Sequence, residues 1–233
     1  ALLPMPVEGI TLDEKMAATN LLLKSGVSIQ EMTAVRKHLS QVKGGQLARL
    51  AHPATLISLI LSDVVGDPLD VIASGPTVGD PTTFQECHEV LNRYALHDKL
   101  PASVKSHLEA GIEGRIPETP KPDEALFSRT LSILVGTNMQ ALQAAAKQAE
   151  KLGYTSLILS SLIEGDTTEA ARFHTALAKE ILMSGHPVRP PACLISGGET
   201  TVVVRGQGKG GRNQHFALEA ALEIEGLQGV CLL

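Results

Sequence analysis

Hydrophobic residues follow a helical spacing in the first part of the chain and a strand-like spacing further on. Thr11 and Ser28 are each followed three residues later by a glutamate, which forms the capping-box signature of a helix N-terminus. Residues 55–61 are apolar except for Thr55 and Ser58 and do not alternate strictly, and such runs are typical of strands buried on both faces in parallel sheets. The pattern therefore predicts two early helices and then a buried strand.

Strand-like and helical segments alternate from residue 130 to the end of the chain. We expect helices over residues 140–152, 168–183 and 212–224, and strands over residues 130–135, 155–159, 192–195 and 230–233. Such alternation indicates an α/β fold with layered parallel or mixed sheets and flanking helices. It predicts a Rossmann-like first domain and part of a second α/β domain.

Three prolines between residues 116 and 123 interrupt the periodicity. Proline-rich segments of this kind are typical of extended linkers. We therefore place a first domain at residues 1–117, a linker at residues 118–127 and a second α/β region at residues 128–233. Because the chain lacks an initiator Met and ends inside an expected strand, we also expect it to be part of a longer protein.

The composition is that of a globular protein with an aliphatic core, since 43% of residues are hydrophobic, 19% are charged and there is no Trp. A net charge of −5 and the shortage of aromatic residues argue against nucleic-acid binding. Three widely spaced cysteines predict neither a disulfide framework nor a zinc site. No apolar run approaches the roughly 18 residues of a membrane helix. We expect a cytoplasmic protein, or a mitochondrial one if a targeting segment precedes Ala1.

Glycines cluster on both sides of a β-branched run near the C-terminus. Gly197 and Gly198 precede this run, and residues 206–211 follow it as a glycine-rich loop that contains Lys209. Arg212 then begins an expected helix. A basic glycine loop in front of a helix N-terminus favours an anion-binding site. The alternative is a turn whose glycines only relieve backbone strain.

Other candidate ligand-binding residues lie in the first half of the chain. Arg36, Lys37 and Lys43 could form a cationic corner for a carboxylate or phosphate, beside the glycine break that follows Lys43. The alternative is that Arg36 and Lys37 belong to a solvated helix face. Asp63 follows the expected strand, where α/β proteins bind ligands, although aspartates there also shape turns or cap helices. Ser74 lies in a loop of small residues.

The glycine-rich loop differs from two common nucleotide-binding motifs. A Walker A motif needs Ser or Thr after its Lys, whereas Gly210 follows Lys209. Residues 206–211 match Gly-x-Gly-x-x-Gly, but the acidic residue expected about 20 positions later is missing. The histidines show no metal-binding spacing. Cationic glycine loops and a strand-end aspartate instead suit phosphoryl transfer, in which positioning and charge neutralisation carry most of the catalysis.

Six phrases of the chain carry a recognisable pattern: Val35-Arg-Lys-His-Leu-Ser, Lys43-Gly-Gly, Leu61-Ser-Asp-Val, Ile72-Ala-Ser-Gly-Pro-Thr, Ser196-Gly-Gly-Glu-Thr-Thr-Val and Gly208-Lys-Gly-Gly-Arg-Asn-Gln. In matching order, they resemble the class II glycerate kinase family, including its animal members. Residues 192–233 are similar to the start of the MOFRL domain of that family, and the first half is similar to the domain that precedes it. The resemblance spans essentially the whole chain.

The resemblance implies ATP-dependent phosphorylation of D-glycerate, with the 2-hydroxyl favoured and Mg²⁺ accompanying ATP. It implies that Asp63 is the base or the substrate-orienting carboxylate, and that Arg212 clamps a phosphate or carboxylate. It predicts neither the protein ligands of Mg²⁺ nor the oligomeric state. Further contacts to substrate or phosphate are expected from Arg36, Lys37, Lys43, Ser74, Gly208, Lys209, Gly210, Gly211 and Asn213.

Two other functions stay open. One is an NAD(P)-linked hydroxypyruvate reductase, which the Gly-x-Gly-x-x-Gly match favours. The other is a catalytically incomplete form with a binding or regulatory role, because a glycine-rich phrase, a site lysine and an acidic loop of the family fall outside residues 1–233. The expected partners are D-glycerate and ATP, with neither nucleic acid nor a membrane, whereas the third function would involve a binding partner or the intact enzyme.

Overall fold

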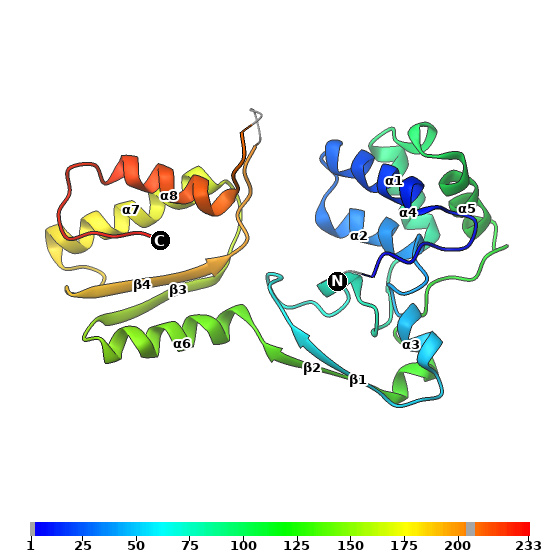
Figure 1. The fold of residues 1–233 in the computed structure, drawn as a ribbon, viewed down its shortest axis with the longest axis horizontal. Coiled ribbons are helices and arrows are strands. Elements are labelled where there is room, and N and C mark those ends of the chain that lie inside the picture. The colour runs from blue at the N-terminus through cyan, green and yellow to red at the C-terminus, as the bar shows by residue number, and fades with distance from the viewer. Residues whose placement is uncertain (1–2, 204–207) are drawn as a thin grey trace. The chain divides into compact units, whose positions relative to one another are not determined.

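The computed structural model describes residues 3–203 and 208–233. These residues form two compact units (Figure 1), one made of Ala1–Leu61 and Asp67–Val135 and the other of Ser62–Gly66 and Gly136–Leu233. Each unit has its own helices and its own pair of strands. We call them unit 1 and unit 2.

Unit 1 is mainly helical. The capping boxes predicted at Thr11 and Ser28 are confirmed, and Thr83 forms a third one at the start of its helix. In each, the hydroxyl accepts a backbone N–H and the glutamate three residues on reaches back to the cap, which satisfies exposed donors of the first turn. The helices are α1 (Leu12–Lys24), α2 (Ile29–His38), α3 (Gln46–Ala51), α4 (Phe84–Arg93) and α5 (Ala102–Ile112), with short 3₁₀ turns η1 (Ile72–Ser74), η2 (His97–Lys99) and η3 (Ala125–Arg129).

The core of unit 1 lies between α1, α2, α4 and α5. Aliphatic residues such as Leu22, Val35, Leu91 and Val104 are fully buried there. Gly111 on α5 leaves the space that the ring of Phe84 occupies, because a Cβ at that position would overlap the ring. This core fixes α1 and α2, whose polar residues form part of the candidate site.

Strands β1 (Leu56–Leu61) and β2 (Thr130–Gly136) pair in the sheet of unit 1. The prediction that the first strand is buried on both faces is wrong, since burial alternates along it and Ile57, Leu59 and Leu61 are exposed. The same alternation occurs on β2. Only two strands form this sheet, and within the described residues one of its faces lacks a covering layer.

Residues 118–127, the expected linker, pack inside unit 1. The Thr119 hydroxyl donates to Asp80 over 3.0 Å, and the Pro120 carbonyl accepts the Asp80 N–H over 2.7 Å. The compact units divide between Val135 and Gly136. Compactness alone does not define family domains, so the boundaries at residues 117 and 128 stay a prediction.

Unit 2 is a layered α/β structure. Strands β3 (Thr155–Ile163) and β4 (Ala192–Gly198) run parallel, with Thr155 opposite Ala192 and Ile158 opposite Ile195. Figure 1 shows α6 (Asn138–Lys151) on one face of this sheet, and α7 (Thr167–Ser184) with α8 (Arg212–Glu223) on the other. The predicted α/β class is confirmed by this arrangement.

The C-terminal strand expected over residues 230–233 is absent, and these residues are irregular. A strand needs a hydrogen-bonded neighbour, and none of the described residues pairs with this segment. The first glycine of the Gly-x-Gly-x-x-Gly match, Gly206, lies outside the described residues. Among the helices that the structure describes, none has the length and hydropathy to cross a membrane.

Candidate functional site

Two glycine-containing loops meet in unit 1. The N–H of Gly44 donates to the Ser74 carbonyl over 2.9 Å, and the N–H of Gly45 donates to the Gly75 carbonyl over 2.8 Å. Gly44 has a φ of 56°, and a Cβ there would lie 3.0 Å from a carboxylate oxygen of Asp80. Glycine is therefore needed here both for the left-handed backbone and for the close approach.

The second loop carries backbone strain at two residues that have side chains. Ala73 has a φ of 54° and Ser74 a φ of 63°. Lys43 reaches into this loop, and its Nζ donates to the Ala73 carbonyl over 3.0 Å. Non-glycine residues in the left-handed region are concentrated at binding and catalytic sites, where surrounding contacts hold them. Ser74, a predicted contact residue, is buried and contributes its carbonyl to the loop pairing.

Lys37 forms a buried ion-pair network with two aspartates. Its side chain is 2% exposed, and its Nζ lies 3.2 Å from Asp80 and 3.3 Å from Asp70. The alternative in which Lys37 belongs to a solvated helix face is therefore wrong. Two carboxylates already neutralise the Lys37 ammonium, so a ligand would have to compete with Asp70 and Asp80 for it. Contact between Lys37 and a ligand stays a prediction.

Asp80 is completely buried and fully hydrogen-bonded. One oxygen accepts from Lys37 and from the N–H and hydroxyl of Thr82, and the other accepts from the Thr119 hydroxyl. Four donors thus satisfy the two oxygens of this buried carboxylate. Its contacts join α2, the segment before α4 and residues 118–127, so Asp80 is a structural anchor of unit 1.

Glu118 and His38 form a second polar contact beside this network. The Nε2 atom of His38 lies 3.1 Å from Glu118, which also accepts the Phe84 N–H over 2.8 Å. Burial favours the neutral carboxyl, but the His38 and Phe84 hydrogen bonds and the nearby Lys121 outweigh it and lower the pKa of Glu118 to about 2. Glu118 therefore stays charged at neutral pH.

Three cationic side chains of unit 1, those of Lys15, Arg36 and Lys43, lie within range of one another's charge. Lys15 of α1 is 6% exposed, and its Nζ has no hydrogen-bond partner among the described residues. Burial lowers the pKa of Lys15 to about 8, with further lowering from the charges of Lys43 and Arg36. Burial and the charge of Arg36 lower the pKa of Lys43 as well. Arg36 and Lys43 of the expected cationic corner thus lie near Lys15, a lysine that sequence reasoning missed, whereas Lys37 pairs with aspartates. Binding of a ligand at this corner stays a prediction.

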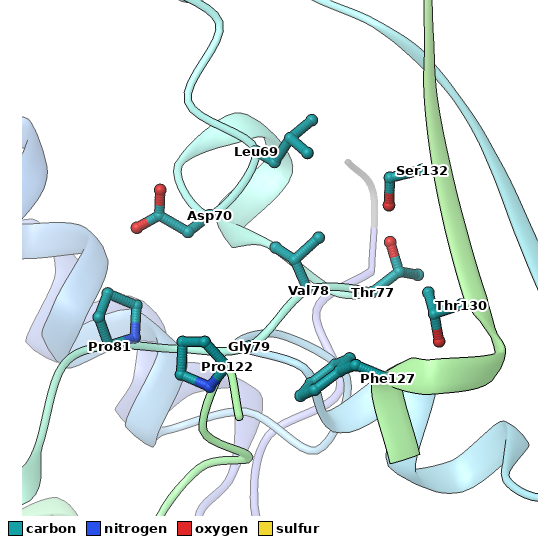
Figure 2. Close-up of a pocket in the computed structure, with 10 residues that line it drawn as sticks. All are labelled: Leu69, Asp70, Thr77, Val78, Gly79, Pro81, Pro122, Phe127, Thr130 and Ser132. Carbon is teal, nitrogen blue, oxygen red and sulfur yellow. The ribbon is translucent and has the colours of Figure 1, made fainter. Parts of the chain in front are cut away.

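A pocket of about 670 Å³ lies against the sheet of unit 1. Figure 2 shows hydroxyl side chains of Thr77, Thr130 and Ser132 on one side of it and Asp70 on the other, with Phe127 between. The Ser132 hydroxyl is buried without a partner among the described residues. Asp70 is the one charged residue of its lining, so the pocket suits a polar group that is not an anion.

The glycine-rich loop of unit 2 ends at the N-terminus of α8. Gly211 occupies the N-cap position, and no side chain caps the first turn. Arg212 is 45% exposed, and its Nη1 donates to Glu199 over 2.9 Å, just beyond the end of β4. Lys209, Asn213 and the glycines Gly208, Gly210 and Gly211 are also exposed, and an open hollow of about 490 Å³ is lined by residues 209–214. The arrangement presents backbone N–H groups and two cations to solvent, which suits an anion.

Gly197 and Gly198 have a packing role. A Cβ on Gly197 would overlap the side chain of Asn138 at the start of α6, and a Cβ on Gly198 would overlap the backbone of Ile163 on β3. These two glycines therefore allow β4 to lie close to its neighbours. Close packing therefore explains why Gly197 and Gly198 are glycines, and no contact with a ligand is needed to explain them.

Asp63 is exposed, two residues after the end of β1. The segment that carries it belongs to unit 2, where the Ser62 N–H donates to the Gly136 carbonyl over 2.9 Å. No hydrogen bond joins Asp63 to Arg212 or to any other residue that the structure describes. Its carboxylate is therefore available to a ligand, and its catalytic role stays a prediction.

Sequence reasoning missed Lys15, Asp70 and Asp80. A signal for Lys15 was present, because it occupies the same face of α1 as the buried Ala18 and Leu22. The aspartates carried no comparable signal, since both lie in irregular segments far from Lys37 in the sequence. No group of three His, Cys, Asp or Glu side chains suited to a metal ion occurs among residues 3–203 and 208–233.

Comparison with protein families shows two matches. Residues 1–109 match a domain of unknown function, DUF4147, and residues 192–233 match the MOFRL family. The glycerate 2-kinase of Pyrococcus horikoshii is 44% identical over 99% of this chain and 52% of its own length. The glycerate kinase of Homo sapiens is 41% identical over 96% of this chain and 49% of its own length.

A solved structure gives the same result. The crystal structure of the glycerate kinase from Thermotoga maritima matches 96% of this chain with a TM-score of 0.78 and 42% identity, over 51% of its own length. Fold and sequence thus define an α/β protein with the DUF4147 and MOFRL family segments. The chain is homologous to the glycerate kinases, and it spans about half the length of the curated relatives it matches.

Proposed function

We propose that this protein acts in the ATP-dependent phosphorylation of D-glycerate, with 2-phosphoglycerate as the product. The observation that carries the proposal is that 99% of the chain aligns, at 44% identity, with a glycerate 2-kinase, and that the alignment includes the Arg212 region. The archaeal and animal relatives have similar identities, 44% and 41%. These identities therefore do not favour the animal glycerate kinases over the archaeal ones as relatives of this chain.

In the proposed reaction, the hydroxyl oxygen of glycerate attacks the γ-phosphorus of ATP while the bond from phosphorus to the ADP oxygen breaks. Asp63 accepts the proton of the attacking hydroxyl or orients that hydroxyl. Arg212 stabilises the charge on the transferred phosphoryl group, because its planar fork matches the phosphoryl oxygens. Glu199 holds one side of this fork through Nη1 and so positions it.

The loop in front of α8 is proposed to cradle phosphate. Lys209, Asn213 and the N–H groups of Gly208, Gly210 and Gly211 face solvent beside Arg212 and are free to bind oxygen atoms. Arg36, Lys43 and Ser74 of unit 1 are proposed contacts of the substrate. Mg²⁺ would bind mainly to ATP phosphates and water with one or two carboxylates, so it does not require the three-residue cluster that the described residues lack.

A coupled assay for ADP release tests the proposal. The purified protein is given ATP, Mg²⁺ and D-glycerate, with glycerol as the matched acceptor that lacks a carboxylate. We expect ADP release that depends on D-glycerate. NADH oxidation with hydroxypyruvate, without ADP release, would identify the reductase instead. If neither reaction occurs but calorimetry detects ATP binding, the incomplete form with a binding or regulatory role is favoured.

A further inference from the structure

Lys15, Arg36 and Lys43 converge from three different segments of unit 1. Lys15 comes from α1, Arg36 from α2, and Lys43 from the loop that follows α2. Their mutual influence is direct, since Lys43 and Arg36 both disfavour the charged form of Lys15. Three positive charges at close quarters repel one another, and burial of two of them strengthens that repulsion.

No carboxylate of the described residues offsets these charges. The buried Asp80 and the partly exposed Asp70 are both bound to Lys37. Glu14, the neighbour of Lys15 on α1, accepts hydrogen bonds from Thr11 and from Ser103 of α5. Burial therefore opposes the charge on Lys15, and the absence of a described partner leaves its Nζ unsatisfied.

We propose that Lys15, Arg36 and Lys43 form a binding site for the oxyanion group of a small molecule, either a carboxylate or a phosphate. Proteins rarely bury a charged side chain without a partner, because its lost hydration is not replaced. An oxyanion would supply the missing acceptor for Nζ of Lys15 and would remove the repulsion between the three cations. Lys15 is the member that completes this site.

The backbone beside the cluster is suited to a binding site. Lys43 is anchored by its hydrogen bond to Ala73, in the loop where Ala73 and Ser74 hold left-handed conformations. Strain of this kind is kept where the local geometry serves a ligand. Arg36 is partly exposed, whereas Lys15 and Lys43 are buried, so an anion enters on the Arg36 side.

The inference deepens the proposed function, because it adds Lys15 to residues proposed as substrate contacts, but it is tested by binding and not by turnover. Calorimetry measures the affinity of the protein for inorganic phosphate and for D-glycerate, with glycerol as the neutral control. Lys15→Met keeps the length of the side chain and removes its charge. Lys24→Met is the matched control, since Lys24 is an exposed lysine on the same helix.

We expect either anion to bind and glycerol not to bind. Lys15→Met should weaken anion binding at least tenfold, and Lys24→Met should bind as the unmodified protein does. Binding of D-glycerate alone identifies a carboxylate site, and binding of phosphate alone identifies a phosphate site. Arg36→Gln, a change at a partly exposed position, should also weaken binding and provides a second test if Lys15→Met fails to fold.

Three results would overturn the inference: no binding of either anion, equal binding of glycerol, or anion affinity unchanged in both Lys15→Met and Arg36→Gln. If the unmodified protein binds the anions but releases no ADP with D-glycerate, only the proposed kinase activity is contradicted. The two proposals can therefore fail separately.

Discussion

Units 1 and 2 place their positive charges in contrasting ways. In unit 1, Lys15, Lys37 and Lys43 are all buried, and only Lys37 is neutralised by carboxylates. In unit 2, Arg212 is exposed at the start of α8 and pairs with a partly exposed glutamate. A buried charge costs far more than an exposed one when its partner is removed. The same kind of ion pair should therefore support the fold in unit 1 and orient a functional group in unit 2.

Lys37→Met should give the largest effect. The change leaves Asp80 fully buried without its cationic partner, and breaking a buried pair in this way costs about 3–5 kcal/mol. Equilibrium unfolding in urea measures the loss. The matched control is Lys24→Met, which removes an exposed lysine. Equal stability of the two variants would mean that the Lys37 network does not hold unit 1 together.

Arg212→Ala should affect turnover rather than stability. Loss of a donor to the transferring phosphoryl group is expected to reduce D-glycerate-dependent ADP release by at least a hundredfold, about 3 kcal/mol in transition-state stabilisation. Circular dichroism should show an unchanged fold, because the side chain is exposed. Arg189→Ala, another exposed arginine of unit 2, is the control. Turnover equal to that of the control would return Arg212 to a structural role.

Acid should weaken unit 1 through Glu118, with a smaller effect of about 1 kcal/mol because this carboxylate is partly exposed. Its folded-state pKa of about 2 lies below the ordinary value, so its contribution is complete above about pH 4.5 and is lost as the pH falls towards 2. Unfolding free energies at pH 6, 4 and 3 should therefore fall more steeply for the unmodified protein than for Glu118→Gln. Parallel pH profiles would exclude this contribution.

Glu199→Gln should have the smallest effect on stability, below about 1 kcal/mol, since it removes a partly exposed ion pair. If Glu199 positions Arg212, kcat of the variant should nevertheless fall, and KM should change little. Thermal unfolding and the ADP-release assay measure the two effects. A loss of stability as large as that of Lys37→Met would remove the contrast between exposed and buried pairs.

Local signals in the sequence predicted the positions of helices better than they predicted which strand faces are buried. Capping at Thr11 and Ser28 and the helix from Arg212 follow from residues adjacent in the chain, so these predictions are confirmed. The exposed face of β1 could not be predicted, because apolar side chains on both faces of a strand indicate cover that the described residues do not provide. The strand expected over residues 230–233 is missing for the same reason, the lack of a neighbour.

For the candidate site too, local sequence features could be predicted and contacts made by tertiary packing could not. Arg36 and Lys43 were predicted from their place beside the glycine break, which is a local feature. The partners of Lys37 could not be predicted, because Asp70 and Asp80 are brought to it by tertiary packing over more than 30 positions. Lys15 could have been predicted as buried, because it is seven residues from Leu22 and lies on the same apolar face of the helix. Its positive charge instead favours an exposed position.

The most direct test of the central contrast compares Lys15→Met with Lys37→Met in equilibrium unfolding, with and without inorganic phosphate. Without phosphate, Lys37→Met should lose stability and Lys15→Met should gain about 1 kcal/mol or more, because the second change removes a buried charge that lacks a partner. Phosphate should then stabilise the unmodified protein more than it stabilises Lys15→Met, since stabilisation by a ligand grows with the affinity of the folded form for it. Similar destabilisation of both variants, with an equal response to phosphate, would show that Lys15 is as structural as Lys37 and would contradict the account.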